Sequence, residues 1–169
     1  PVPGGPSTRR LIARSGQLGV PLLAGLIEAD AGKLYNTYLA VSPEGFVAKF
    51  RKLHAFISPH LSWGEEFCLF DLCGVRCAIL TCYDNNLVEN PRIVAMEGAE
   101  VVFAPHVTCG LQSPMPGRGT IDKALWDNRH RDPVPLRMEF EGPKGRAWLL
   151  RWLPTRAYEN GLYYVFTNA

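Results

Sequence analysis

The order of apolar segments along the chain limits the folds that it can adopt. One apolar strand is followed by two hairpins, each closed by a tight turn that contains glycine, and further strands then alternate with helical segments. The expected strands cover residues 20–27, 33–41, 46–51, 67–72, 76–82, 100–105 and 163–169. Hairpins followed by strand–helix–strand–helix–strand predict an α/β domain in which helices pack on layered sheets.

Three segments carry the start and stop signals of helices. The first is capped by Ser7 or Thr8 and stops at Gly19, because a glycine adopts the left-handed conformation that ends a helix. The second covers residues 87–97, and the third is a kinked helix over residues 146–160.

Two other segments carry expectations of their own. Residues 20–27 are apolar at nearly every position, which predicts a strand buried on both faces. Residues 106–145 are rich in glycine and proline and form a long loop with one turn of helix near 122–127. Loops of that length inside compact domains are usually functional, so we expect this one to shape the choice of substrate.

Composition argues against several classes of function. The net charge is +2, from 18 basic and 16 acidic residues, and the basic residues are scattered, so nucleic-acid binding is not expected. The apolar runs have the length of strands and are too short to cross a membrane. No histidines or cysteines have the spacing of metal ligands, and we expect neither a metal nor another cofactor. The five cysteines form no regular framework and indicate reduced thiols of a cytoplasmic protein: Cys68, Cys73, Cys77, Cys82 and Cys109.

Both ends of the sequence lack the usual features of a domain boundary. The chain starts at Pro1 without a methionine, and residues 163–169 form a strand that no turn or polar tail follows. We therefore expect residues 1–169 to be a single domain truncated at both ends.

Cys82 is the first candidate for chemistry. It stands where an apolar strand ends and a helix is expected to begin, so its thiol faces unpaired backbone N–H groups and the positive end of a helix dipole. Both features favour the nucleophilic thiolate. Lys52 closes another strand within the basic cluster of residues 50–54. Together, the two residues predict a cysteine hydrolase with a lysine beside its nucleophile.

Seven short motifs then suggest a family. They are Gly-Leu-Ile-Glu at 25–28, Tyr-Asn-Thr at 35–37, Pro-Glu-Gly at 43–45, Phe-Arg-Lys-Leu-His at 50–54, Thr-Cys-Tyr-Asp at 81–84, Gly-Ala-Glu at 98–100 and Arg-Ala-Tyr-Glu-Asn-Gly at 156–161. In this order, they resemble the nitrilase superfamily of carbon–nitrogen hydrolases. The resemblance implies an αββα sandwich, incomplete in this chain, and a catalytic triad of glutamate, lysine and cysteine.

The resemblance also implies roles for individual residues. Cys82 would attack the carbonyl or nitrile carbon, while Lys52 and the backbone N–H of Tyr83 would stabilise the tetrahedral intermediate. His106, at a strand end, is either a substrate contact or a loop histidine with satisfied hydrogen bonds. His60 is a further candidate for the substrate pocket.

Two carboxylates of the family's site have no clear match. The family's general base is a glutamate that precedes the first residue of this chain, and Glu28 matches a different family position. We therefore expect the isolated segment to be inactive. Many relatives carry a second glutamate in the loop after the lysine, and His60, Glu65 and Glu66 are the alternatives that this loop offers.

The leading functional interpretation is hydrolysis of a non-peptide carbon–nitrogen bond in a small amide, carbamoyl compound or nitrile. Transfer of the acyl group to an amine, and a catalytically silent interaction module, are the alternatives. By resemblance, the whole protein would be a homo-oligomer paired through the helices at 87–97 and 146–160.

Overall fold

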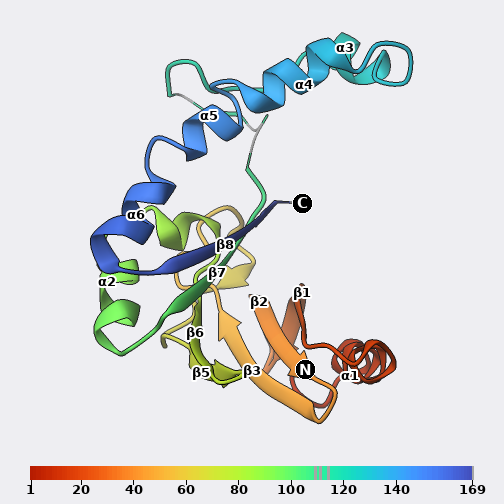
Figure 1. Ribbon diagram of the computed structural model, residues 1–169. Helices are drawn as coiled ribbons and strands as arrows, with labels where there is room; N and C mark the ends of the chain where they lie inside the picture. The colour runs from red at the N-terminus through yellow and green to blue at the C-terminus, as the bar shows by residue number, and fades with distance from the viewer. Residues whose placement is uncertain (109, 111, 114, 169) are drawn as a thin grey trace.

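Two four-stranded sheets lie face to face in the computed structural model, which describes residues 1–108, 110, 112–113 and 115–168 (Figure 1). The first sheet has the order β1-β2-β3, with β4 also paired to β2. The second has the order β5-β6-β7-β8. The strands are β1 (Leu22–Asp30), β2 (Lys33–Ser42), β3 (Gly45–Arg51), β4 (Leu61–Ser62), β5 (Leu69–Leu72), β6 (Val75–Ile79), β7 (Val101–His106) and β8 (Tyr163–Asn168).

Helices cover the outer faces of the two sheets (Figure 1). Helix α1 packs on the first sheet, while α2 and α6 lie on the outer side of the second. The helices are α1 (Pro6–Leu18), α2 (Glu89–Met96), α3 (Lys123–Asp127), α4 (Val134–Glu141), α5 (Arg146–Leu149) and α6 (Leu153–Asn160). The predicted αββα layering is therefore confirmed. No helix in the described ranges is both long and apolar enough to span a membrane.

The core between the sheets is built from alternating strand positions. Ala48 and Phe50 of β3 belong to one buried cluster with Phe70 of β5 and Ala78 of β6. Residues at alternate positions of a strand share a face, so the intervening Lys49 and Arg51 lie on the opposite, outer face of the first sheet. Burial of these apolar side chains supplies the main favourable free energy that holds the two sheets together.

The first helix and strand differ from the sequence prediction in detail. Helix α1 begins at Pro6 after Gly5, not at a Ser7 or Thr8 cap, because proline is well suited to the first position of a helix. It ends at Gly19, as predicted, with a left-handed φ of 68°. The prediction that residues 20–27 are buried on both faces is wrong, since β1 is an edge strand and Ile27 is 61% exposed.

The long segment before β8 also contains more helix than predicted. The expected turn near 122–127 is present as α3, which Asp122 caps by accepting a hydrogen bond from the Ala124 N–H at 2.8 Å. Helix α4 was not predicted. The kinked helix expected over residues 146–160 is two helices, α5 and α6, and Pro154 lies in the first turn of α6. Proline lacks the N–H that a continuous helix would need at that point.

Gly64 packs against the backbone of Arg51 and Lys52, where the chain leaves β3. Its N–H donates to the Lys52 carbonyl at 2.9 Å, and a Cβ at this position would lie 2.1 Å from the Arg51 carbonyl oxygen. We expect Gly64→Ala to lower the free energy of unfolding by about 1–3 kcal/mol, measured by urea denaturation. Gly16→Ala is the control, because a Cβ there meets no atom within 4 Å and should stabilise α1 by about 0.5–1 kcal/mol. Equal effects of the two substitutions would contradict this account.

Candidate active site

Cys82 lies in a sharp turn that follows β6. It opens a single 3₁₀ turn, η1 (Cys82–Asn85), and helix α2 begins only at Glu89. The helix expected to begin at this junction is at first only this 3₁₀ turn, and a four-residue turn has only a small dipole. Cys82 has a φ of 51°, a left-handed conformation that costs a non-glycine residue about 1–3 kcal/mol. Its thiol is partly exposed.

Lys52 approaches this turn from the other sheet. It directly follows β3, and its side chain is 4% exposed. The Nζ atom donates to the Thr81 carbonyl oxygen at 2.5 Å and lies 3.4 Å from Asp84 Oδ1. The structure therefore brings the amine of Lys52 to the backbone next to Cys82.

The charge on Lys52 is set by opposing effects. Burial lowers the pKa of Lys52, whereas the negative charge of Asp84 and that of a Cys82 thiolate raise it. Burial is the largest of these effects, so the pKa lies below its ordinary value. An acidic neighbour is therefore what favours the ammonium form in this buried position.

Asp84 is a site residue that sequence reasoning quoted only as part of a motif. Its carboxylate is fully buried. Oδ1 accepts hydrogen bonds from the backbone N–H of His54 at 3.0 Å and from His54 Nδ1 at 2.9 Å, while Oδ2 accepts from the Thr81 N–H at 3.3 Å. The signal that could have identified it is its position two residues after the candidate nucleophile and within its turn.

Two asparagines hold η1 in place. Asn85 Nδ2 donates to the Leu80 carbonyl at 2.7 Å and to that of Cys82 at 3.2 Å. Asn90 Nδ2 donates to the Asp84 carbonyl at 2.8 Å. Because these amides satisfy carbonyl groups that the short turn leaves free, the left-handed backbone at Cys82 is fixed from both sides.

His106 ends the neighbouring parallel strand. Strands β6 and β7 pair as far as Ile79 opposite Phe103, and the turn η1 that contains Cys82 contacts β7. His106 is 5% exposed, and its Nδ1 lies 2.9 Å from the Ala104 carbonyl oxygen. Burial lowers the pKa of His106, and the nearby charge of Lys52 adds to this effect, so the ring is neutral at pH 7.

The other predicted pocket residues lie farther out. The side chain of Tyr83 is 39% exposed and packs edge-on against Phe56, with ring centroids 4.8 Å apart. His60 is exposed in the loop before β4, where its backbone N–H donates to Ser58 Oγ at 3.3 Å. Within the described ranges, no hydrogen bond or ion pair joins His60 to Lys52 or Cys82.

The two candidate glutamates of the same loop are also exposed. Glu65 and Glu66 border a cleft of about 560 Å³ that Lys49 and Arg51 line from the outer face of the first sheet. The described contacts place neither carboxylate beside Lys52. Which residue takes the position of the family's second glutamate therefore stays a prediction, with His60, Glu65 and Glu66 as the alternatives.

Glu28 has a structural role. Its carboxylate is buried on the outer face of the first sheet and accepts hydrogen bonds from Thr37 Oγ1, Lys49 Nζ and Arg51 Nε, each at 2.8 Å. Burial alone would raise the pKa of Glu28, but the hydrogen bonds from Arg51, Lys49 and Thr37 outweigh it and lower the pKa to about 2. A carboxylate that holds its proton so weakly is a poor general base at neutral pH.

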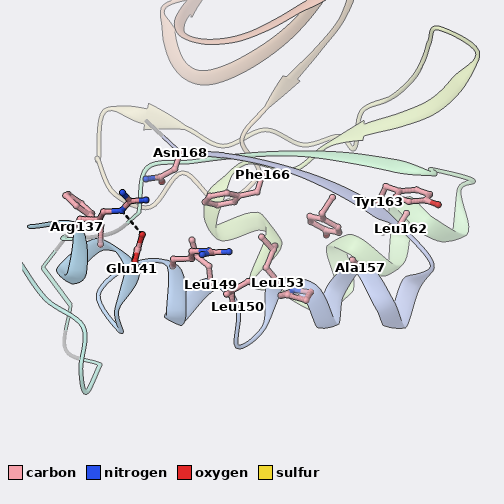
Figure 2. Close-up of a pocket in the computed structure, with 14 residues that line it drawn as sticks. Arg137, Glu141, Leu149, Leu150, Leu153, Ala157, Leu162, Tyr163, Phe166 and Asn168 are labelled. Atoms are coloured by element: carbon pink, nitrogen blue, oxygen red, sulfur yellow. Dashed lines mark hydrogen bonds and ion pairs between the residues drawn. The ribbon is translucent and has the colours of Figure 1, made fainter. Parts of the chain in front are cut away.

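A large apolar groove lies away from Lys52 and Cys82. It has a volume of about 850 Å³ and runs between helices α4–α6 and strand β8 (Figure 2). Leu149, Leu153 and Phe166 line it, and Arg137 forms an ion pair with Glu141 at one end. The ring centroid of Phe166 is also 4.9 Å from that of His106, so this side chain borders both the groove and the candidate site.

Cys68, Cys73 and Cys77 lie outside the site. Burial raises the pKa of Cys68 to about 11, and burial together with Asp71, Glu100 and Cys73 raises that of Cys77. Cys73 is exposed in the β5–β6 turn, and Cys109 falls outside the described residues. Across the described part of the chain, no three histidine, cysteine or acidic side chains are grouped to hold a metal ion.

Comparison with known proteins identifies the family. The family described as carbon–nitrogen hydrolase matches residues 2–169 of the chain. The chain is therefore a member of the carbon–nitrogen hydrolase family. The predicted family is confirmed.

The similar carbon–nitrogen hydrolases are nitrilases and amidases. The chain is 33% identical to a nitrilase of Pyrococcus abyssi over 62% of its length, and 36% identical to an (R)-stereoselective amidase of Pseudomonas sp. over 65%. It is 35% identical to human omega-amidase over 60% of its length. These matches span 41%, 40% and 41% of the respective relatives, so the chain covers about two fifths of their length.

A solved amidase has the same fold as this carbon–nitrogen hydrolase chain. The amidase from Nesterenkonia sp. AN1 superimposes with a TM-score of 0.66 at 19% identity, and the match covers 95% of this chain and 52% of the amidase. The likeness agrees with the predicted α/β class and with the two-sheet arrangement in Figure 1.

The Glu28 cluster predicts a defined dependence of stability on pH. The folded-state pKa of Glu28, about 2, lies below its ordinary value of 4.5, so the carboxylate stabilises the fold above pH 4.5 and this contribution is lost as the pH falls toward 2. We expect Glu28→Gln to be less stable at pH 7 and to show a flatter stability curve over this range in urea titrations. Glu65→Gln, at an exposed glutamate, is the control. Parallel curves for Glu28→Gln and the unmodified protein would show that the cluster does not stabilise the fold.

Proposed function

We propose that the protein containing this chain hydrolyses a non-peptide carbon–nitrogen bond of a small amide, carbamoyl compound or nitrile through an acyl-enzyme on Cys82. The main support is the contact of Lys52 Nζ with the Thr81 carbonyl oxygen, which holds a buried amine at the backbone next to Cys82, a partly exposed residue. Membership of the carbon–nitrogen hydrolase family agrees with this chemistry.

With an amide or carbamoyl substrate, the Cys82 sulfur first attacks the carbonyl carbon, and the thiol proton passes to a general base. The developing oxyanion is stabilised by the Lys52 ammonium and the backbone N–H of Tyr83. Collapse of the tetrahedral intermediate breaks the carbon–nitrogen bond, and the nitrogen leaves as an amine or ammonia after it takes up the proton.

In the second step, water attacks the thioester and releases the acid, which restores the Cys82 thiol. The general base for both steps is a glutamate by family resemblance, and we propose that it is not among these 169 residues. The Glu28 carboxylate already accepts hydrogen bonds from the Lys49 and Arg51 side chains and from the Thr37 hydroxyl. The Asp84 carboxylate accepts hydrogen bonds from His54 and from the Thr81 N–H. Neither carboxylate is free to accept the proton.

Selective alkylation tests whether Cys82 is the nucleophile. Acrylamide and fluoroacetamide are suitable probes, because solved structures of the Nesterenkonia amidase carry covalent adducts of both at the active-site cysteine. We expect Cys82 to react at least about tenfold faster than Cys68 and Cys77, whose raised pKa values keep them as thiols. Peptide mass spectrometry over a time course measures the three rates.

Exposed Cys73 is the internal control for this experiment, since it has full access to reagent but no buried lysine beside it. Equal rates for Cys82 and Cys73 would favour a catalytically silent module. If an acyl-enzyme forms, products analysed with and without an added amine separate hydrolysis from acyl transfer.

Substitution of Lys52 tests the oxyanion role. We expect Lys52→Met in the full polypeptide to lower kcat by about 10²–10³-fold, because the intermediate loses its charged hydrogen-bond donor. Ammonia release from a panel of primary amides provides the measurement. Lys33→Met, at an exposed lysine that begins β2, is the matched control and should retain activity. Full turnover in Lys52→Met would remove this residue from the mechanism.

A further inference from the structure

Asp84 contacts the candidate catalytic lysine but is not part of the family triad described above. The geometry points to Asp84 as the positioning residue that holds the Lys52 ammonium charged and aimed at the oxyanion formed at Cys82. This inference rests on the proposed hydrolysis and adds a residue to it. It is carried by the buried contact of 3.4 Å between Lys52 Nζ and Asp84 Oδ1.

The hydrogen bonds of Lys52 leave one donor for the substrate. An ammonium group carries three N–H donors, and two of them face the Thr81 carbonyl oxygen and the Asp84 carboxylate. Among the residues that the structure describes, no third acceptor is hydrogen-bonded to Nζ. Because two acceptors fix the orientation of the group, the third N–H has a defined direction beside the backbone that leads to Cys82.

Asp84 is itself held too firmly to act on a substrate. The backbone N–H of His54, its Nδ1 atom and the Thr81 N–H occupy the two carboxylate oxygens, and the Asn90 amide binds the Asp84 carbonyl. The side chain is fully buried beneath these contacts. Asp84 therefore acts through Lys52, and its hydrogen bonds connect the segment after β3 with the turn after β6.

The charged surroundings of Lys52 make this contact necessary. Cys82 and Asp84 of η1 face the ammonium, with His54 from its own segment and the neutral ring of His106 from β7. A lysine that is 4% exposed would lose its charge more readily without a nearby anion, because burial penalises the charged form. Removing the Asp84 charge should therefore leave a neutral amine, which is a weak stabiliser of an oxyanion.

Titration of Lys52 in Asp84→Asn tests this role without any substrate. Protein labelled with ¹³C and ¹⁵N in lysine is titrated by NMR, and the Lys52 signal is assigned by its loss in Lys52→Met. We expect the titration midpoint of Lys52 to fall by about 1–3 pH units in Asp84→Asn, because an opposite charge within 4 Å favours the ammonium form. An unchanged midpoint would overturn the inference. Asp71→Asn, at an exposed aspartate paired with Arg76, is the control and should leave Lys52 unchanged.

The pH profile of turnover gives a second readout that a purely structural role would not move. In the full polypeptide, the alkaline limb of kcat/KM should shift to lower pH by the same amount as the Lys52 midpoint. A lower kcat/KM with an unshifted limb would mean that Asp84 only supports the fold. If no acyl-enzyme forms at Cys82, the proposed function fails, while the NMR titration still decides whether Asp84 holds Lys52 charged.

A double variant covers the case in which Asp84→Asn folds poorly. If the two groups hold each other, Lys52→Met leaves a buried carboxylate without its cation, and adding Asp84→Asn removes that unpaired charge. The Tm loss of the double variant should then be clearly smaller than the sum of the two single losses. Additive losses would show that the pair is not coupled and would overturn the inference.

Discussion

The hydrogen bond from Lys52 to the Thr81 carbonyl, together with the contacts of Asp84 with Lys52 and His54, joins the ends of two sheets whose shared core is apolar. Each sheet supplies one member of the candidate pair: Lys52 follows β3, and Cys82 follows β6. The pair therefore exists only when the sheets are packed in a single relative position. Close packing in the shared core fixes that position more narrowly than a flexible lysine side chain could.

Two buried carboxylates in this chain show how the same residue chemistry serves different purposes. Glu28 is surrounded by Lys49, Arg51 and Thr37, which consume its hydrogen-bonding capacity and link three strands of one sheet. Asp84 has fewer cationic partners and stands between two different layers of the fold. A carboxylate saturated by donors stabilises structure, whereas one with a single buried ammonium beside it can also set the charge of that ammonium.

Local sequence patterns predicted the strands and their turns well, because these depend on neighbouring residues. The β2–β3 hairpin, α2 and the end of α1 at Gly19 lie close to their predicted positions. Lys52 and Cys82 do follow strands, as the sequence indicated, while their catalytic roles stay a prediction. The 3₁₀ turn at Cys82, the role of Asp84 and the exposure of β1 could not be predicted in this way. Each depends on contacts with segments far away in the sequence, such as the bond between Asp84 and His54.

The parallel register of β6, β7 and β8 brings the carboxyl ends of three strands to one edge of the second sheet. There His106 pairs with Asn168, and the turn η1 that carries Cys82 follows β6. Helices α3, α4, α5 and α6 lie in the chain between β7 and β8, whereas Lys52 and Cys82 both precede β7. Changes of length in the connection between β7 and β8 therefore leave the separation of Lys52 and Cys82 along the chain unchanged.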